Sequence, residues 1–255
     1  MTDSSTGRDR HWPGVRRIGL DRPLAWLKAG SRDLLGNPIA SLAYGLLFAI
    51  AGDVILIFSW RNAYLFTAAL SGFFLVAPLL AGGLYEISRR RAAGLRSTFV
   101  DSLAGWRRNG ESMAMFGLLL TLAAIVWERT SAVLFALFVP TLTPDVAVFV
   151  SDVLLNPDYR GLTLVWILSG GILALLVFAV SAVSIPMLVD REVDFVTAML
   201  TSLRAVARNP GPLLLWAALV AVLTLAGFAT LLFGLVILMP LLGHASWHAY
   251  RDLVE

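Results

Sequence analysis

Several ionisable side chains stand at related places in this chain, where they could build a polar site. Three prolines, Pro78, Pro186 and Pro240, are each followed by two apolar residues. Eight positions beyond these prolines stand Glu86, Asp194 and His248, and four positions beyond them stand Gly82, Asp190 and His244. Ionisable side chains at membrane depth usually face the protein interior. If the elements that carry them pack around one axis, we expect a cluster of Glu86, Asp190, Asp194, His244 and His248.

His244 and His248 lie four residues apart, which places both imidazoles on one face of a helix with Arg251 close by. Two histidines at this spacing can bind one metal ion. The alternative is that both are interfacial histidines hydrogen-bonded by carboxylates and backbone, while Arg89–Arg91 pair with Glu86. The chain has no cysteine and no HExxH, phosphate-binding or nucleophile-elbow motif. We therefore predict no catalytic residue and no cofactor, and keep metal or haem binding at the two histidines as an alternative.

Asp53 is a separate charge inside the first apolar stretch. It lies about 24 Å along a helix from Asn37 at 1.5 Å per residue, which places it toward the outer end of that stretch. An ion pair with Arg61 or Arg129 is the favoured interpretation, and a role in proton relay is the alternative.

The composition indicates how these residues are positioned. The chain is 58% hydrophobic and 15% charged, whereas soluble domains carry about 25% charged residues. Several runs approach the roughly 20 apolar residues that cross a bilayer. We therefore predict an all-α membrane protein whose partner is the lipid bilayer. The net charge of +3 is explained by membrane topology, and we expect no nucleic-acid partner.

One unit occurs three times: a short polar helix ending in asparagine, then a long apolar stretch that closes on one of the three prolines. The asparagines are Asn37, Asn109 and Asn209. Internal repeats of this kind indicate a repeated architecture. The pattern predicts six transmembrane helices as three pseudo-repeated helical hairpins, each preceded by a short amphipathic inner-face helix.

The predicted spans have the following limits: Ile39 to Phe58, Tyr64 to Ser88, Met113 to Trp127, Leu162 to Val189, and two within Leu213–Leu242 joined near Gly227–Gly234. Glu128-Arg129 is expected to end the third span. The last block is too long for one ordinary span and short for two, although an amphipathic extension to about Tyr250 makes two feasible. The outer loop 130–160 should hold a surface helix that begins at Thr143-Pro144.

Basic residues predict the orientation. Of the 20 Lys and Arg residues, 17 fall in the proposed inner segments, and only Arg61, Arg129 and Arg160 fall outside. The positive-inside rule then puts both termini in the cytoplasm. We expect a disordered basic tail over 1–22 and a single transmembrane domain over 23–255, in a bacterial inner membrane.

The first inner-face helix is predicted to be amphipathic. Leu24, Leu27, Leu34 and Leu35 would face lipid. Lys28, Arg32 and Asp33 would face water.

With these landmarks in place, the chain resembles the DUF2189 family of bacterial predicted integral membrane proteins. The resemblance rests on Gly72-Phe73, Pro78, 83–90, 184–191, Ala198-Met199, 209–212 and 243–251, and it covers roughly residues 22–253. It implies a multi-pass membrane protein and carries no established activity. Some members bear a label likening them to cytochrome c oxidase subunit I, which needs six histidines for its haems and copper. This chain has three histidines, so that activity is excluded.

Three functions fit these observations. The leading one is a non-enzymatic accessory, assembly or scaffold component of a respiratory or photosynthetic membrane complex, which implies another integral membrane protein as partner. The second is transport of a small solute, lipid or ion. The third is metal or haem handling through His244 and His248.

Overall fold

The computed structural model describes residues 13–61, 65, 69, 72–73, 77–139 and 146–255. Their fold is built from helices, with no strand beyond a single antiparallel bridge between Val15 and Val254. The longer helices are α1 (Arg22–Gly36), α2 (Pro38–Ser59), α4 (Gly82–Ala92), α7 (Gly110–Phe138), α9 (Arg160–Ser181), α11 (Phe195–Arg208), α12 (Pro210–Ala229) and α13 (Leu235–Leu253). The short ones are α5 (Phe99–Ser102), α6 (Ala104–Arg107), α8 (Val146–Phe149), η1 (Val150–Leu154), η2 (Pro157–Tyr159) and α10 (Ser184–Asp190).

Four helical segments within the described residues are long and apolar enough to cross a bilayer. They are Pro38–Ser59, Gly110–Phe138, Pro157–Asp190 and Pro210–Ala229. This confirms the prediction of an all-helical membrane protein. Much of the predicted second span, Tyr64 to Ser88, lies outside the described residues, and its inner end forms α4.

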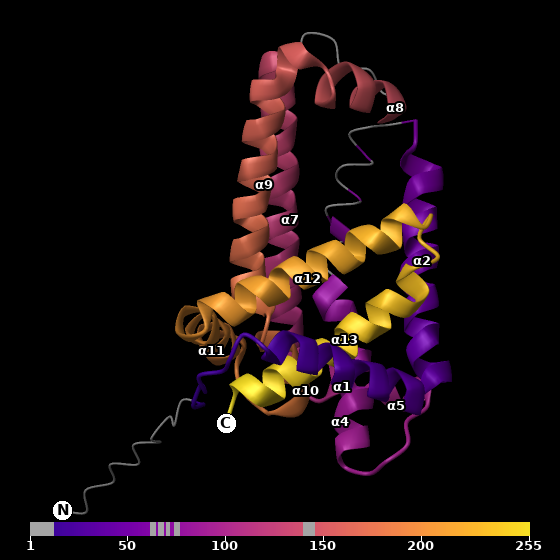
Figure 1. Cartoon of the computed structure of the whole chain (residues 1–255), viewed down its shortest axis with the longest axis vertical. Coiled ribbons are helices and arrows are strands. Elements are labelled where there is room, and N and C mark those ends of the chain that lie inside the picture. Colours follow the sequence, from indigo (N-terminus) through magenta and orange to yellow (C-terminus); the bar gives the residue numbers. More distant parts are fainter. Residues whose placement is uncertain (1–12, 62–64, 66–68, 70–71, 74–76, 140–145) are drawn as a thin grey trace, which may run out of the picture.

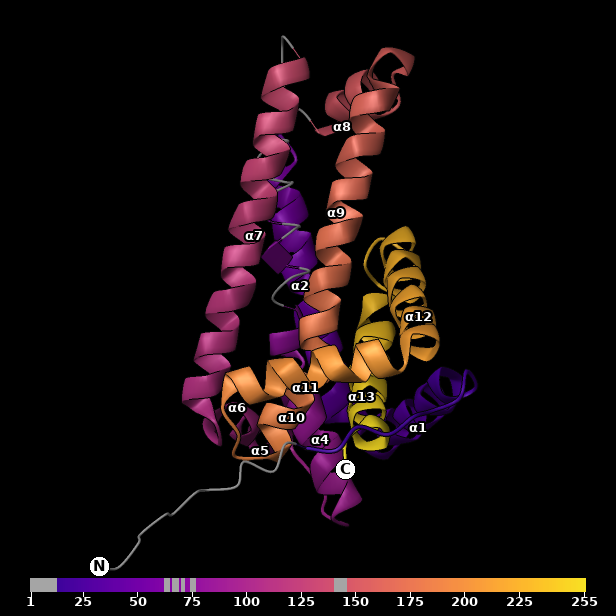
Figure 2. The ribbon, with the colours of Figure 1, turned by 90° about the vertical axis from the view of Figure 1, so that its left-hand side faces the viewer.

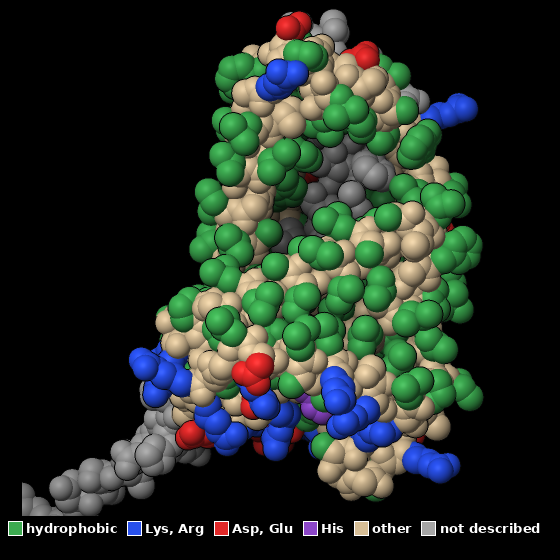
Figure 3. Space-filling view, viewed as in Figure 1, with side chains coloured by type: hydrophobic (Ala, Val, Ile, Leu, Met, Phe, Trp, Pro, Cys, Tyr) green, Lys and Arg blue, Asp and Glu red, His purple; other side chains and the backbone are tan. Residues whose placement is uncertain are grey.

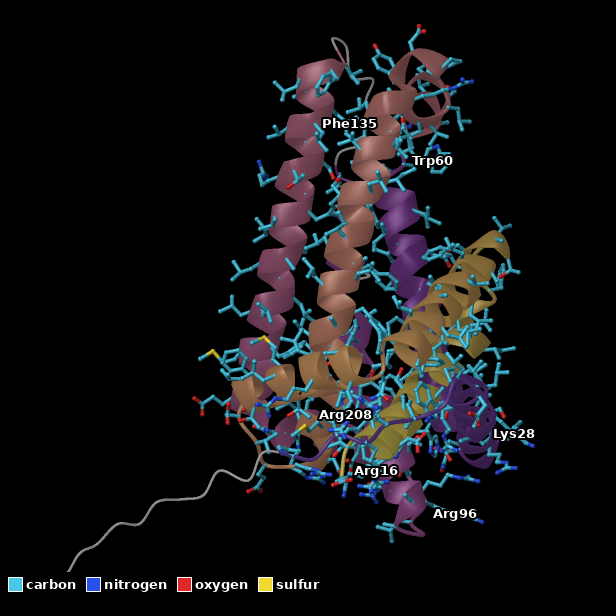
Figure 4. All side chains as sticks on the ribbon, turned by 60° about the vertical axis from the view of Figure 1, so that its left-hand side comes forward. Arg16, Lys28, Trp60, Arg96, Phe135 and Arg208 are labelled. Carbon is cyan, nitrogen blue, oxygen red and sulfur yellow. The ribbon has the colours of Figure 1, made fainter. Side chains whose placement is uncertain are left out.

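The helices divide the molecule into two ends. Figures 1 and 2 show α7 and α9 side by side, with α1 and α11 lying across the direction of these long helices at one end, near the C-terminus. Lys and Arg side chains gather at this end, which we call the basic end (Figure 3). Figure 4 places Arg16, Lys28, Arg96 and Arg208 there, and Trp60 and Phe135 at the opposite, distal end.

One predicted span limit was wrong. Helix α7 continues through Glu128-Arg129 to Phe138, because the Arg129 Nε atom lies 2.6 Å from the Glu128 carboxylate and the two charges compensate each other. The predicted fourth span, Leu162 to Val189, agrees with the candidate span Pro157–Asp190, but it is not one continuous helix, since α9 ends at Ser181. The chain breaks at Ala182-Val183, where the Val183 amide donates to the Ser202 hydroxyl, and α10 follows.

Residues 146–154 are helical, in the region where a surface helix was predicted. Helix α8 continues into the π-helical turn η1, and Phe149 packs edge-on against Phe135 of α7 at 4.9 Å between ring centroids. The Val146 amide donates to the carbonyl of Trp60. The predicted start at Thr143-Pro144 lies outside the described residues.

The predicted second inner-face helix is also different, since the structure has two short helices, α5 and α6, in its place. Thr98 and Asp101 form a capping box that starts α5.

The three asparagines share one backbone conformation. Their φ/ψ angles are −138°/58° for Asn37, −135°/52° for Asn109 and −132°/54° for Asn209. Each asparagine stands directly before a candidate span. Its backbone carbonyl accepts a hydrogen bond from the amide four residues later in the chain. At each of the three sites, the chain changes direction at the asparagine before the next long helix begins.

Two of these asparagine side chains also hold an extended segment from elsewhere in the chain. Asn109 donates to the carbonyl of Val193, just before α11. Asn209 donates to the carbonyl of Arg16 and accepts from the amide of Ile18, just before α1. Each therefore fixes the entry to a helix that lies across the spans.

The N-terminal segment 13–18, part of the predicted tail, is held at the basic end. Besides its contacts with Asn209, the Arg16 amide donates to Leu253 and Gly14 accepts from the Glu255 amide, at 2.8 and 3.0 Å. Residues 1–12 of that tail lie outside the described residues.

Candidate functional site

The most highly connected polar group lies at the basic end, among α1, α2, α4 and α13. It comprises Asp33, Ser41, Ser88, Arg91, His244 and His248, and we call it the His–Asp cluster. Glycines let these helices approach closely enough to form it. A Cβ atom on Gly30 of α1 would come within 2.7 Å of the Ala245 amide nitrogen of α13, and one on Gly45 of α2 would overlap the Val236 carbonyl.

The hydrogen bonds of this cluster form donor-to-acceptor chains that end on the Asp33 carboxylate. The Ser88 hydroxyl donates to Asp33 Oδ2 at 2.6 Å, so its oxygen is left to accept from His244 Nδ1 at 2.8 Å. His244 therefore carries its proton on Nδ1, and its bare Nε2 accepts from the Ser41 hydroxyl at 2.8 Å. The network thus assigns one tautomer to His244.

Asp33 collects two further donors. His248 Nε2 donates to Oδ2 at 2.8 Å, and Arg91 Nε lies 3.0 Å from Oδ1. Burial alone would raise the pKa of the Asp33 carboxyl, but the hydrogen bonds from His248 and Ser88 outweigh it and hold that pKa below its ordinary value. Asp33 is consequently an anion in a nearly sealed site.

His244 has the opposite tendency. Its side chain is fully buried, and burial lowers the pKa of its imidazole to about 4, against a weaker pull from the Asp33 charge. It lies outside the four candidate spans, where α13 packs on α1. His244 is thus a neutral imidazole near pH 7 that bridges α2 and α4.

Asp33 is the part of the site that sequence reasoning missed. It was predicted to face water, yet only 6% of it is exposed. The buried face of α1 consists of Pro23, Trp26, Gly30 and Asp33. This i, i+3, i+7, i+10 spacing is a helical stripe. An aromatic and a glycine on the stripe of Asp33 were the signal that could have identified it.

Glu86, a predicted site residue, forms a separate network. It is fully buried in α4. Arg89 donates to both of its oxygens at 2.7 Å, and Arg108 lies 3.6 Å away. The predicted pairing of Arg89 with Glu86 is present, whereas Arg91 pairs with Asp33 instead. Glu86 therefore ties α4 to the segment after α6.

Asp190 forms a third network with the end of α13. The Tyr250 hydroxyl donates to Asp190 at 2.7 Å and accepts from Arg191 Nε at 2.8 Å. Arg251 lies 3.2 Å from the same carboxylate. Burial and the Asp190 carboxylate raise the pKa of the Tyr250 phenol. The predicted gathering of ionisable residues is thus divided into separate networks, although α4, α10 and α13 contact one another.

Two predicted site residues stand apart from these networks. Asp194 caps α11 by accepting from the backbone amide and the hydroxyl of Thr197, at 2.9 and 2.6 Å. Asp53 is exposed on α2. Arg129, one of its two predicted partners, lies 2.6 Å from the Glu128 carboxylate.

The two histidines do not face a common point. They are connected through Ser88 and Asp33, and both nitrogens of His244 already have serine partners. Among the described residues, no group of three His, Asp or Glu side chains is arranged to hold a metal ion. The chemistry of the cluster is therefore that of a closed hydrogen-bond network linking four helices.

Comparison with known proteins gives one match. Residues 65–190, which carry Glu86, Ser88, Arg91 and Asp190, match the model of the DUF2189 family, described as a predicted integral membrane protein. No curated protein and no solved structure matches the chain. The resemblance found in the sequence motifs is confirmed over residues 65–190, which belong to the DUF2189 family of predicted integral membrane proteins.

Proposed function

We propose that this chain is a non-enzymatic accessory or scaffold protein that binds another integral membrane protein within the bilayer. One observation carries the proposal: the buried ionisable groups of the basic end are paired within the chain. Glu86 and His244 are fully buried and both have partners. A closed polar network of this kind makes a structure rigid and specific, and the polar atoms of Glu86 and His244 are occupied by partners within the chain.

The flanks of the spans supply the surface for a partner. Only 17% of the apolar window of α7 lies buried inside the chain. Val126 of α7 and Ile172 of α9 are each at least half exposed. Figure 3 shows apolar side chains over α9 and α12. We propose that the α7–α9 pair carries the docking face, and that the bound protein is a component of a respiratory or photosynthetic complex.

The proposal includes a threefold repeat of one helical unit and a membrane topology with both termini on one side. The common backbone conformation of Asn37, Asn109 and Asn209 supports three related units. In each unit the chain would pass from a helix at the membrane face into an apolar hairpin. The charge asymmetry supports a cytoplasmic basic end in the bacterial inner membrane, with both termini on that side.

A transporter is the second candidate, and Asp53 is the observation that favours it. An exposed carboxylate on a candidate span is costly in lipid and often has a role in ion or solute passage. The sealed Glu86 argues against a path through the basic end. Metal or haem handling at His244 and His248 would require breaking the contacts that both rings now make with serine and aspartate.

Native purification with photo-crosslinking tests the scaffold proposal. A photoreactive residue is placed at Val126 or Ile172 in the chain expressed at native level, and a matched control places it at Leu231 in the α12–α13 turn. We expect a discrete protein adduct from the first two positions, which mass spectrometry identifies, and none from Leu231. A monomeric protein in mild detergent without adducts at either α7–α9 position would refute the proposal.

Measuring uptake by the purified protein in vesicles distinguishes the transporter function from the scaffold function. A membrane-potential-driven proton or solute flux that Asp53→Asn abolishes would favour transport over the scaffold.

A further inference from the structure

The two arms of the α12–α13 hairpin have 20 and 19 residues and are shorter than α2, α7 and α9. Figures 1 and 2 both place its turn below the distal ends of α2, α7 and α9. The turn, Thr230–Gly234, can be located along α2 from two contacts. Gly45 faces the Val236 backbone, and a Cβ atom on Gly52 would lie 2.9 Å from the Leu232 side chain. Gly52 stands about 10 Å before the distal end of α2 at Ser59.

This depth places the turn inside a bilayer that α2 crosses. The 22 residues of α2 span about 33 Å, close to the roughly 30 Å hydrocarbon core. The turn then lies about two-thirds of the way across from the basic end. A turn that reached the distal surface would need two more helical turns in both arms of the hairpin.

The composition of the turn fits hydrocarbon. No Asp, Glu, Lys or Arg occurs from Pro210 to Tyr250. Leu231 and Phe233 at the turn are each 78% exposed. The distal ends of the other helices carry interfacial anchors, such as Trp60-Arg61 after α2 and Tyr159-Arg160 at the start of α9. The α12–α13 turn has none.

Several backbone amides of the turn are hydrogen-bonded within it. Leu231, Phe233 and Leu235 donate their amides to Phe228, Thr230 and Leu232 at 2.9–3.2 Å. The Thr230 hydroxyl accepts the Gly234 amide and donates to the Gly227 carbonyl, both at 2.8 Å. Hydrocarbon offers no partner for a backbone polar group, so irregular backbone at membrane depth needs such internal bonds.

The choice of residue at the turn also indicates an apolar environment. Leu231 and Leu232 have φ angles of 53° and 68°. This left-handed conformation ordinarily selects glycine, asparagine or aspartate, because a larger side chain costs about 1–2 kcal/mol. Asparagine or aspartate would leave a polar side chain in lipid. Two leucines in this conformation are consistent with a site where apolarity outweighs backbone strain.

We propose that α12–α13 is a re-entrant hairpin: it enters the bilayer from the basic end, turns within the hydrocarbon and returns, with lipid tails covering Leu231 and Phe233. This replaces the fifth and sixth crossings with one hairpin that never reaches the distal surface. Both of its ends remain on the same side, so the charge asymmetry of the chain is unchanged.

The absence of cysteine makes the test direct. Leu231→Cys and Phe233→Cys are compared with Arg61→Cys at the distal end and Lys28→Cys on α1, each as the full chain in phosphatidylcholine–phosphatidylglycerol vesicles. Arg61 and Lys28 are both exposed. A membrane-impermeant maleimide is applied from both sides. We expect labelling at positions 61 and 28, and none at 231 or 233 until detergent denatures the protein.

A nitroxide on the same cysteines distinguishes lipid from protein around the turn. At 231 and 233 we expect ready collision with oxygen, which concentrates in hydrocarbon, and little with a water-soluble nickel complex. Maleimide labelling at 231 as fast as at 61 would mean a full crossing and overturn the proposal. Protection from both oxygen and nickel would mean a protein cover and overturn the lipid assignment. Both side chains are exposed, so the substitutions remove no packing contact on which folding depends.

Discussion

Acidification should destabilise this protein through one residue, His244. The unfolded imidazole takes up a proton near its ordinary pKa of 6.5, whereas the pKa of the folded, buried ring is lowered to about 4. In the window between these values the unfolded state binds more protons. The free energy of unfolding therefore rises with pH in this window, and it falls on acidification.

The magnitude follows from the two pKa values. At pH 7.5 the His244 ring is neutral in both the folded and the unfolded state, so its titration costs no stability. At pH 5 the unfolded ring is almost fully protonated and the folded ring is mostly neutral, which costs about 2 kcal/mol. For a chain of this size that corresponds to a fall in the unfolding temperature of about 4–8 °C.

Thermal unfolding followed by tryptophan fluorescence in mild detergent, at a series of pH values from 7.5 to 5, measures this loss. The test variant is His244→Gln, which can still hydrogen-bond Ser41 and Ser88 but does not titrate. Between pH 7.5 and pH 5, the unfolding temperature of His244→Gln should fall by about 4–8 °C less than that of the parent protein.

The controls use the other two histidines of the chain. His248→Gln and His11→Gln should both retain the acid sensitivity that comes from His244. The reasoning is refuted if His244→Gln keeps the full pH dependence of the parent protein. It is also refuted if His248→Gln alone abolishes that dependence.

Three further predictions concern the helix contacts at the basic end. Glu86→Ala leaves Arg89 without its carboxylate at a buried site and should lower the free energy of unfolding by about 3 kcal/mol, read from denaturant titration, whereas Glu86→Gln should cost less. Asn209→Ala removes the side chain that holds the segment 16–18, so trypsin should cleave after Arg16 faster than in the parent chain; equal rates would contradict this role. Gly45→Val pushes α2 from the Val236 backbone of α13 and should lower the unfolding temperature more than Gly171→Val, whose site is open; the reverse order would be inconsistent with the close contact.

Composition and hydropathy were enough to predict a helical membrane protein, because burying or embedding apolar surface decides the class of fold. They also located α2, α12 and the start of α9 to within a few residues. The end of α7 was missed for a physical reason: Glu128 and Arg129 neutralise each other, so a charged pair in the sequence did not act as a helix stop.

The site was predicted only in part. The spacing from the three prolines identified Glu86, Asp190, His244 and His248, and each of them lies in a hydrogen-bond network at the basic end. It could not identify Asp33, because that residue comes from another helix and is recruited by the close approach of Gly30 to α13. Contacts between distant segments of the chain are not encoded in local spacing.

The bridge between Val15 and Val254 places the two ends of the described chain beside each other. Gly14 and Glu255 share a backbone hydrogen bond, so a short linker from Glu255 back to Pro13 would cover little distance. Residues 13–255 are in effect a ring opened at one seam at the basic end. This part of the chain should therefore accept circular permutation, with new ends in the exposed turn at Gly94 after α4, where the φ angle is positive and the space around the glycine is open.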